Sequence, residues 1–402
     1  MIPQNPILPR TYVIVLNYNN WEDTIECLES LFGQHDKDFR VVVCDNGSQD
    51  NSLEKIRQWS LGELSINTTR INIPGANDTI APKPIRYQSI EADKIKNGST
   101  LLNSTRLVLL GAKENLGFSG GNNIGIQVAL MDKQCEYIWL LNNDTVIDQL
   151  ALDFLIKKMS SNQNVGILGS TILYYHDTSI VQALGGFTYN RFLGLSRQLG
   201  HLKRFDRTDL SPEYVTSLEK RMFGIQGASI FMRKTFLQQS GLLSEDYFLY
   251  SEELDLSMQN TGCFTLGYAP ESIVYHKEGK TTGSDSRKGK TKSLISEYYL
   301  ATSRLLFTQK YFPRFLSGVC FAHLLITAKR FFHGNWENAL VVLLSTIFFM
   351  NDRNKNGTIR NDRGSFKHFL NRVQCNPMLH VVGEKMRQRE FSKDLPYDPE
   401  TP

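Results

Sequence analysis

Paired cysteines are missing from this chain. Zinc ribbons need close cysteine pairs and small secreted domains need a dense disulfide framework, so the cysteine spacing excludes both classes. We expect reduced thiols in an intracellular protein. The six cysteines are far apart and include no C-x-x-C pair: they are Cys27, Cys44, Cys135, Cys263, Cys320 and Cys375.

An excess of charge of one sign is also missing. The 45 Lys and Arg residues nearly balance the 41 Asp and Glu residues, and the net charge of +4 gives no reason to expect nucleic-acid binding. The first ten residues lack an apolar signal-peptide core, and no unbroken apolar run approaches the ~18 residues of a spanning helix. We therefore expect a cytoplasmic protein, and its 402 residues predict more than one unit.

Strands and helices alternate regularly near the N-terminus. The β-branched run at residues 11–16 predicts a strand that ends in Asn17, with a helix from Trp21. Residues 39–44 predict a second strand, which ends at Asp45 and is followed by another helix. This order is typical of an α/β fold with a mostly parallel, Rossmann-like sheet flanked by helices. Residues 61–106 lack periodicity and predict a surface insertion between two elements of the sheet.

Polar side chains follow two of the predicted strands. The apolar run at residues 137–141 ends in Asn142-Asn143-Asp144. Ligands of open α/β sheets bind beyond the carboxyl ends of the strands, where carboxylate and amide oxygens can hold a divalent cation. Asp45 has the equivalent place on an earlier strand and could accept hydrogen bonds from a nucleobase or a ribose. For both carboxylates the structural alternative is an Asx turn or a helix cap.

Residues 114–125 are rich in glycine and asparagine. The glycines at 117, 120, 121 and 125 precede a predicted helix that runs through residues 128–130. Free backbone N–H groups at the start of a helix can bind an anion. Close packing of the helix is the structural alternative.

Acidic residues open another predicted helix, at Glu252, Glu253 and Asp255. A carboxylate there could take a proton from an attacking hydroxyl, and the alternative is pairing with the helix dipole. His276 follows a predicted strand, where a lone histidine is more often structural. The basic residues 277–292 predict either a mobile cationic loop or a solvated linker.

Taken together, these motifs resemble glycosyltransferase family 2, and most closely its rhamnosyltransferase-like, inverting members with the GT-A fold. The matching strings are V-L-N-Y-N at 15–19, V-C-D-N-G-S at 43–48, N-L-G-F-S-G-G-N-N at 115–123 and L-L-N-N-D at 140–144. The resemblance covers most of residues 11–312, apart from the insertion.

This resemblance implies a dTDP- or UDP-sugar donor and a divalent Mn²⁺ or Mg²⁺ ion. The metal would be held by Asp144 and His276, the latter alternatively contacting the diphosphate. Glu253 would be the catalytic base, with Glu252 beside it and Asp255 in reserve. The donor-binding residues implied are Leu16, Asn17, Asp45, Asn115, Gly117, Gly121, Asn122, Asn142, Asn143, Gly227 and Ala228.

Two positions depart from the family pattern. Asn142 stands where the family's Asp-x-Asp-type motif has its first carboxylate, so metal binding depends mainly on Asp144. Glu253 stands where the family has an aspartate, and its side chain is one methylene longer.

A helical extension with a polar tail is predicted at residues 293–402, after a transferase domain at residues 1–292. It contains two apolar runs, residues 315–328 and 339–350, which predict either helices lying on a membrane surface or helices packed on the protein or in a homodimer. The cations that would meet anionic lipid are Lys310, Arg314, Lys329 and Arg330.

Two function hypotheses follow. The first is an inverting glycosyltransferase that moves a sugar, with rhamnose favoured, to a surface polysaccharide or a polyprenyl-linked glycan at the inner face of the cell membrane. The second is a catalytically silent scaffold that binds a nucleotide sugar or glycan in a polysaccharide assembly complex, and its support is the Glu-Glu pair. A dinucleotide oxidoreductase is disfavoured because the glycine turn is not G-x-G-x-x-G.

Overall fold

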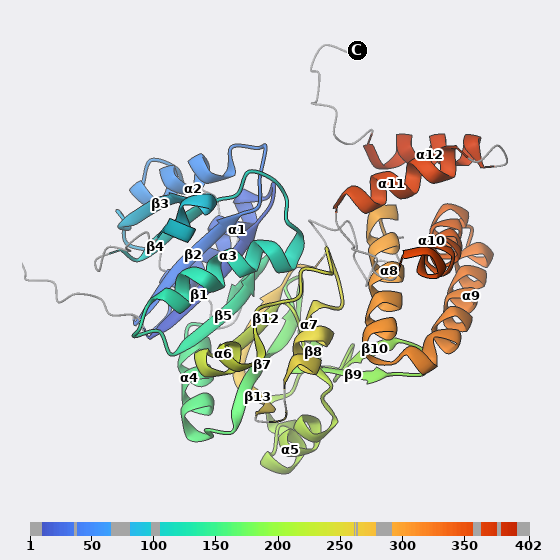
Figure 1. Ribbon diagram of the computed structural model, residues 1–402. Coiled ribbons are helices and arrows are strands. Elements are labelled where there is room, and N and C mark those ends of the chain that lie inside the picture. The colour runs from blue at the N-terminus through green and yellow to red at the C-terminus, as the bar shows by residue number, and fades with distance from the viewer. Residues whose placement is uncertain are drawn as a thin grey trace, which may run out of the picture. The chain divides into compact units, whose positions relative to one another are not determined.

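The structure is a computed structural model that describes residues 10–35, 38–65, 81–97, 105–260, 262, 264–278, 292–356, 363–375 and 379–391. The chain divides into two compact units (Figure 1). The first comprises Met1–Tyr189, Leu195–Glu245 and Glu252–Thr281. The second comprises Asn190–Gly194, Asp246–Ser251 and Thr282–Pro402.

Five parallel strands form one half of the large sheet in the first unit. Because they run in the same direction, the carboxyl ends of neighbouring strands lie at one edge, which is where ligands bind in open α/β sheets. In spatial order the strands are β3 (Tyr87–Glu91), β4 (Leu107–Gly111), β2 (Phe39–Asp45), β1 (Thr11–Asn17) and β5 (Tyr137–Asn142).

Strand directions are mixed in the other half of the sheet. There β12 (Ser229–Arg233) runs antiparallel between β5 and β7 (Val165–Tyr174), and β13 (Thr265–His276) is parallel to β7. Two more strands, β6 (Thr145–Ile147) and β8 (Asp177–Leu184), pair antiparallel with β13 and β7. A separate small sheet contains β10 (Leu195–Gln198), β9 (Gly186–Asn190) and β11 (Gly224–Ile225).

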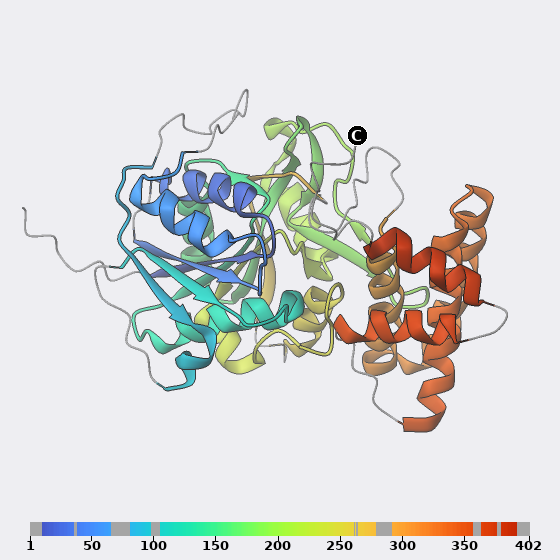
Figure 2. The same cartoon turned by 90° about the horizontal axis from the view of Figure 1, so that it is seen from above.

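Helices cover both faces of the large sheet (Figure 2). Along β1, Val13 and Val15 pack in one hydrophobic core, while Tyr12 and Ile14 pack in another, because successive side chains of a strand point to opposite faces. The first core contains α1 (Trp21–Phe32), α2 (Ser52–Leu61) and α4 (Ala151–Ser161). The second contains α3 (Gly117–Met131) and α6 (Lys234–Ser240). Outside these cores, α5 spans Pro212–Arg221.

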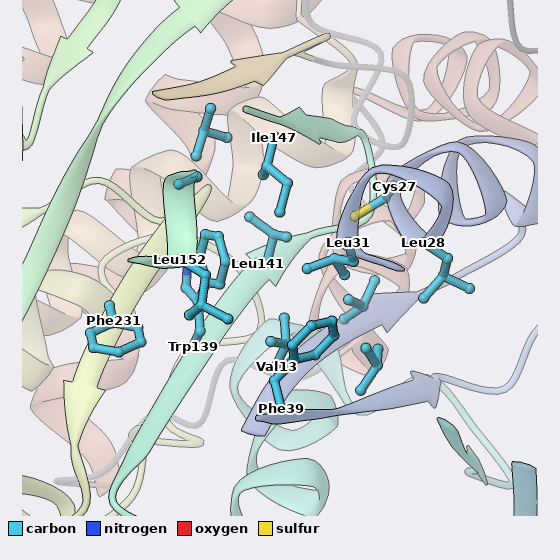
Figure 3. Close-up of a cluster of buried hydrophobic side chains, with 14 of the residues drawn as sticks. Val13, Cys27, Leu28, Leu31, Phe39, Trp139, Leu141, Ile147, Leu152 and Phe231 are labelled. Atoms are coloured by element: carbon cyan, nitrogen blue, oxygen red, sulfur yellow. The ribbon is translucent and has the colours of Figure 1, made fainter. Parts of the chain in front are cut away.

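Large side chains fill the first core (Figure 3). Trp139 of β5 and Phe231 of β12 are fully buried, with ring centroids 6.4 Å apart in an edge-to-face arrangement. Removing either ring would cost about 3–5 kcal/mol, because the cavity left behind adds to the lost burial. The sequence-based prediction of an α/β fold with a mostly parallel, helix-flanked sheet is confirmed.

The prediction for residues 61–106 is wrong in part, because this stretch is more than a surface insertion. Tyr87–Glu91 forms the edge strand β3 of the large sheet, parallel to β4. An edge strand that faces solvent carries few apolar residues, so its sequence showed no clear period. Residues 66–80 and 98–104 of this stretch lie outside the described residues.

A buried carboxylate holds the segment that leads into β3. Glu29 of α1 accepts a hydrogen bond at Oε2 from the Ala81 N–H (2.7 Å), and its Oε1 lies 3.1 Å from Lys83 Nζ. The indole of Trp59 donates to the same Oε1 at 2.6 Å. Such a satisfied buried charge fixes residues 81–83 against α1 and α2.

Helices make up most of the second unit. In one core among the described residues, α8, α10, α11 and α12 share a cluster that includes Tyr298, Tyr299, Phe366 and Phe369. In another, α9 packs beside α10 after a turn at Gly334 (φ +75°). The helices are α8 (Leu294–Tyr311), α9 (Leu316–Phe332), α10 (Trp336–Asn356), α11 (Arg363–Gln374) and α12 (His380–Phe391).

The expectation that no segment has the length and apolar character of a membrane-spanning helix is wrong for this unit. The segment Pro313–Phe332 is 20 residues long, and an 18-residue window within it has a mean hydropathy of 1.3. Its length and composition are therefore enough to cross a membrane, although no unbroken apolar run suggested it. The polar side chains of Ser317, His323 and Thr327 interrupt the run in the sequence without lowering its mean hydropathy far.

Candidate active site

The carboxyl ends of β1, β2 and β5 bring predicted donor-binding residues together. Asn17 at the end of β1 is in register with Asp45 at the end of β2, and Leu16 is in register with Asn142 at the end of β5. Asn17 and Asp45 are buried, whereas Leu16 and Asn142 are partly exposed. These side chains lie at the same edge because the three strands are parallel, as the sequence predicts.

A chain of hydrogen bonds joins these strand ends through Thr24 of α1. Asn143 Nδ2 donates to Thr24 Oγ1 (3.0 Å), and Thr24 Oγ1 donates to Asn17 Oδ1 (2.7 Å). Asn17 Nδ2 then donates to Asp45 Oδ1 (2.7 Å). Sequence analysis missed Thr24, and the only signal for it was a hydroxyl in the first turns of a helix that follows a polar strand end.

Asp45 also closes the turn after β2. The Ser48 backbone N–H donates to Asp45 Oδ2 (3.1 Å), and the Ser48 hydroxyl donates to Oδ1 (2.5 Å). Burial raises the pKa of Asp45, and the hydrogen bonds from Ser48 and Asn17 offset only part of that rise. The structural alternative, a turn closed by the carboxylate, is therefore present, and it fixes the carboxylate at the binding edge.

Asn46 attaches the glycine-rich segment to the same edge. Its Nδ2 donates to Asn115 Oδ1 (2.9 Å) and to the Gly117 carbonyl (3.0 Å), and its Oδ1 accepts from the Leu116 N–H (2.9 Å). Sequence analysis did not single out Asn46, although it adjoins Asp45. Through this contact Asn115 and Gly117 lie beside the end of β2.

The predicted place of the glycines is wrong, because α3 begins at Gly117 and the others lie inside it. A Cβ atom at Gly121 would lie 2.4 Å from Leu16 Cδ1, and one at Gly125 would lie 2.7 Å from Ile14 Cγ2. These glycines let α3 pack closely on β1, which was the structural alternative. A donor contact at Gly121 stays a prediction.

Asn122 and its neighbour Asn123 make structural hydrogen bonds. Asn122 Nδ2 donates to the Phe118 carbonyl one helical turn back (2.9 Å). Asn123 exchanges hydrogen bonds with the backbone of Leu243, at 2.9 and 3.1 Å. Within the described part of the chain, no hydrogen bond joins Asn122 to another predicted donor-binding side chain.

The end of β13 brings His276 to Asp144. His276 Nε2 lies 3.1 Å from Asp144 Oδ1, and both side chains are buried. On the other side of the ring, Nδ1 lies 2.8 Å from Oε1 of buried Gln182 on β8. Burial lowers the pKa of His276, but the adjacent Asp144 carboxylate and the charge of Glu278 together outweigh this effect, so the net pKa is raised. Sequence analysis missed Gln182.

Lys277 fixes the chain directly after His276. Its ammonium group forms ion pairs with Asp23 and Glu26 of α1. The Tyr175 hydroxyl donates to Glu26 Oε1 (2.6 Å). Lys277, which the sequence assigned to a mobile loop or linker, is thus held against the helix that carries Thr24. Residues 279–291 of that predicted loop lie outside the described residues.

Asp144 and His276 fit a divalent cation. Two adjacent ligands of an octahedral Mg²⁺ lie about 3 Å apart, which is comparable to the 3.1 Å between the two side-chain atoms. An imidazole nitrogen suits Mn²⁺ better than Mg²⁺. Among the described residues no group of three or more His, Cys, Asp and Glu side chains could hold a metal. Other ligands would therefore be asparagine, diphosphate or water oxygens.

The turn before β12 connects the predicted base with the end of β5. A Cβ atom at Gly227 would lie 2.2 Å from Oε1 of Glu253, which stands in α7 (Glu252–Gln259). The carbonyl of the adjacent Ala228 accepts a hydrogen bond from the Asn142 N–H (3.1 Å). Two predicted small residues thus lie between the base and the Asn-Asn-Asp string.

Burial raises the pKa of both glutamates at the start of α7. The pKa of Glu253, whose side chain is partly exposed, rises to about 7. The pKa of buried Glu252 rises well above its usual value, mainly by burial and further by the charge of Glu253. A base with a pKa near neutrality can be ionised and still accept a proton. Asp255 is fully buried and accepts a hydrogen bond from Gln259 Nε2 (2.8 Å), which gives it a structural role.

Comparison with known proteins confirms the resemblance to glycosyltransferase family 2 over part of the chain. Residues 12–72, which contain Asn17 and Asp45, match the family model described as glycosyl transferase family 2. No curated protein matches the sequence.

Solved structures of glycosyltransferases are similar to this chain at low identity. The mannosyltransferase PcManGT from Pyrobaculum calidifontis, in complex with GDP-Man and Mn²⁺, is 12% identical, with 98% of this chain and 88% of that chain covered and a TM-score of 0.44. S. aureus TarS 1-349 in complex with UDP-GlcNAc is 13% identical, with coverage of 84% and 81% and a TM-score of 0.42. GalNAc-T7 with UDP, GalNAc and Mn²⁺ is 14% identical, with coverage of 77% and 50% and a TM-score of 0.49.

Proposed function

We propose that this chain is an inverting, metal-dependent glycosyltransferase that moves a sugar from a nucleoside diphosphate to a hydroxyl group. The observation that carries the proposal is the buried Asp144–His276 pair, 3.1 Å apart, at the carboxyl edge of a sheet. Asp45 lies at the same edge, and Asn142 connects that edge through Ala228 to the turn beside Glu253. The family match of residues 12–72 supports the same reaction class.

In the proposed reaction, the acceptor oxygen forms a bond to the anomeric carbon while the bond from that carbon to the diphosphate oxygen breaks. Attack from the face opposite the leaving group inverts the configuration. Glu253 accepts the proton of the acceptor hydroxyl, and the nucleoside diphosphate leaves with the bonding electrons. A bound Mn²⁺ or Mg²⁺ would neutralise the negative charge that develops on the diphosphate.

Side chains of the chain itself would bind the donor and the cation. Asp45 and Asn17 offer a carboxylate and an amide to the nucleobase or ribose, and Asp144 and His276 would hold the cation. Gly227 has no side chain, so the Glu253 carboxylate can lie directly beside the turn before β12. Asp45 and Asn17 are already held by hydrogen bonds to each other, so they are oriented before a donor arrives.

The donor and acceptor classes come from the family resemblance. We propose a dTDP- or UDP-sugar donor, with rhamnose as the favoured sugar, and a hydroxyl of a surface polysaccharide or polyprenyl-linked glycan as the acceptor. The reaction would take place in the cytoplasm, where nucleotide sugars are available.

Donor consumption tests the proposal directly. The purified chain is incubated with a panel of dTDP-, UDP- and GDP-sugars and Mn²⁺, with and without acceptor glycans, and NMR follows the nucleotide released and the anomeric configuration. We expect one donor to be consumed with inversion, and Glu253→Gln to lose about 10²–10⁴-fold in rate. Saturable donor binding without turnover across all acceptors would instead support the silent scaffold.

A further inference from the structure

One face of α9 exposes large apolar side chains to solvent. Phe321, Leu324 and Leu325 are 55–56% exposed, and Phe332 is 85% exposed. Spacings of three, four and seven to eight residues place these side chains along one side of a helix. Scattered exposed apolar residues are ordinary, whereas a continuous stripe of them marks an interaction surface. We call this stripe the α9 face.

The opposite side of α9 is anchored, so the helix cannot turn this stripe inward. Leu316 and Val319 are buried in a cluster with Phe349 of α10. His323 Nδ1 lies 2.8 Å from the hydroxyl oxygen of Thr346 on α10, and both side chains are buried. Rotating α9 to bury its exposed Phe and Leu side chains would expose Leu316, Val319 and His323 instead.

The charged side chains within residues 313–332 all have one sign. Residues 313–332 contain no Asp or Glu, and their cations are Arg314, Lys329 and Arg330. Arg314 and Lys329 are exposed at opposite ends of the stripe. Arg330 forms an ion pair with Glu297 of α8 (3.2 Å). An apolar stripe with the exposed cations Arg314 and Lys329 beside it complements the anionic head groups and acyl chains of a lipid surface.

We propose that the α9 face binds an anionic membrane surface, with α9 lying along the interface. Lys and Arg at the two ends would meet lipid phosphates while the Phe and Leu side chains enter the acyl boundary. The observations behind this proposal lie in the helical unit alone, and it can be tested without a donor or an acceptor. A peripheral attachment of this kind would bring the chain to a lipid-linked substrate.

A spanning arrangement fits the contacts of α9 less well. Its partner α10 is apolar only over residues 339–350, about 18 Å of helix, while the acyl core is about 30 Å thick. The pair Glu297–Arg330 also joins α8 to α9, so inserting α9 would draw a partly buried ion pair toward the acyl core. These contacts favour a helix on the surface.

Flotation of the full chain with lipid vesicles tests the proposal. We expect the protein to float with vesicles of phosphatidylcholine containing about 30 mol per cent phosphatidylglycerol, and to float at least about tenfold less with phosphatidylcholine alone or in 1 M salt. Leu324→Asp with Leu325→Asp should reduce binding at least about tenfold. Met131→Asp is the matched control, because Met131 is 51% exposed on α3 and should leave binding unchanged.

Conservative variants protect the test against misfolding. Arg314→Gln with Lys329→Gln alters exposed side chains only, and should weaken binding to anionic vesicles several-fold with an unchanged melting temperature. Binding that is equal in all variants overturns the proposal. So does a concentration-dependent dimer that Leu324→Asp with Leu325→Asp makes monomeric in the absence of vesicle binding, because the face would then bind a second copy. Protein that stays in the vesicles after alkaline carbonate extraction would show a spanning helix instead.

Discussion

A Cβ atom at Gly227 would lie 2.2 Å from Oε1 of Glu253, so position 227 has room for the carboxylate only because it has no side chain. Gly227→Ala should therefore displace the carboxylate while the fold is kept, since a carboxylate at the end of a flexible side chain can move. We expect transfer to fall about 10–100-fold, because a displacement of about 1 Å has effects of this size. Gly33→Ala is the control for a general effect of replacing glycine by alanine on stability. The Cβ atom at Gly33 would come no closer than 3.3 Å to its surroundings.

The ionisation of Glu253 should govern the pH dependence of transfer. Burial raises its pKa to about 7, and only the ionised carboxylate accepts a proton. We expect kcat/KM to rise with pH through about 7 and then level off, as long as the donor and metal stay bound. Rates measured from pH 5.5 to 8.5 for the wild type check this expectation. A rate that is flat over that range would exclude Glu253 as the base.

Glu253 should also make the stability of the fold depend on pH. Its pKa is about 7 in the folded chain and about 4.3 in an unfolded chain. Between these values the folded state binds more protons, so the free energy of unfolding should fall as the pH rises. Glu253→Gln cannot ionise at this position, so it avoids this fall in the free energy of unfolding. At pH 8 the variant should be more stable than the wild type by about 1–2 kcal/mol, after allowance for the partial exposure of the Glu253 side chain. At pH 4 urea titrations should give the same free energy of unfolding for the two proteins.

Gln182 should control how His276 binds a cation. With a proton on Nδ1, His276 donates to Gln182 Oε1 (2.8 Å), which leaves Nε2 directed at Asp144. Gln182→Leu removes this acceptor, and we expect Mn²⁺ affinity to fall about 10–100-fold, as is common when the partner of a ligating histidine is lost. Calorimetry with Mn²⁺ alone measures the effect, with Asp144→Asn as the positive control and the exposed Gln163→Leu as the matched neutral one. Equal affinity in Gln182→Leu and the wild type would contradict the assignment.

Thr24 should stabilise the strand ends through its hydroxyl. Thr24→Val removes the link between Asn143 and Asn17 and leaves both amides short of a partner. Burying a polar group without its partner costs about 1–3 kcal/mol, and the free energy of unfolding should fall by that amount. Thr24→Ser keeps the hydroxyl and should lose less than about 1 kcal/mol. Urea unfolding of the three proteins, followed by circular dichroism, checks this expectation.

Much of the site could be predicted because local sequence controls it. The apolar runs predict strands, and their alternation with helices predicts that the strands are parallel. Parallel neighbours end at one edge, so the meeting of Asn17, Asp45 and Asn142 follows once these strands are neighbours in the sheet. The polar strand end predicts Asp144, and the resemblance adds His276 as its partner and selects Glu253 as the base. The structure joins the first two directly and places the third against Gly227.

Other features depend on contacts between segments far apart in the chain. The sequence does not specify that Thr24 bridges two strand ends, that Gln182 contacts the ring of His276, or that Lys277 pairs with Asp23 and Glu26. The strand at residues 87–91 was not predicted for a related reason. A strand at the solvent-facing edge of a sheet needs few apolar side chains, so its sequence lacks a clear alternating pattern.

The order of the elements, the class of the fold and the polar character of the strand ends follow from the sequence alone, because periodicity and turn residues act over a few neighbouring positions. The contacts between these polar groups, the packing role of the glycines and the exposed face of α9 appear only in the folded chain. Those outcomes depend on the register of non-adjacent strands and the rotation of packed helices, and no local pattern fixes either.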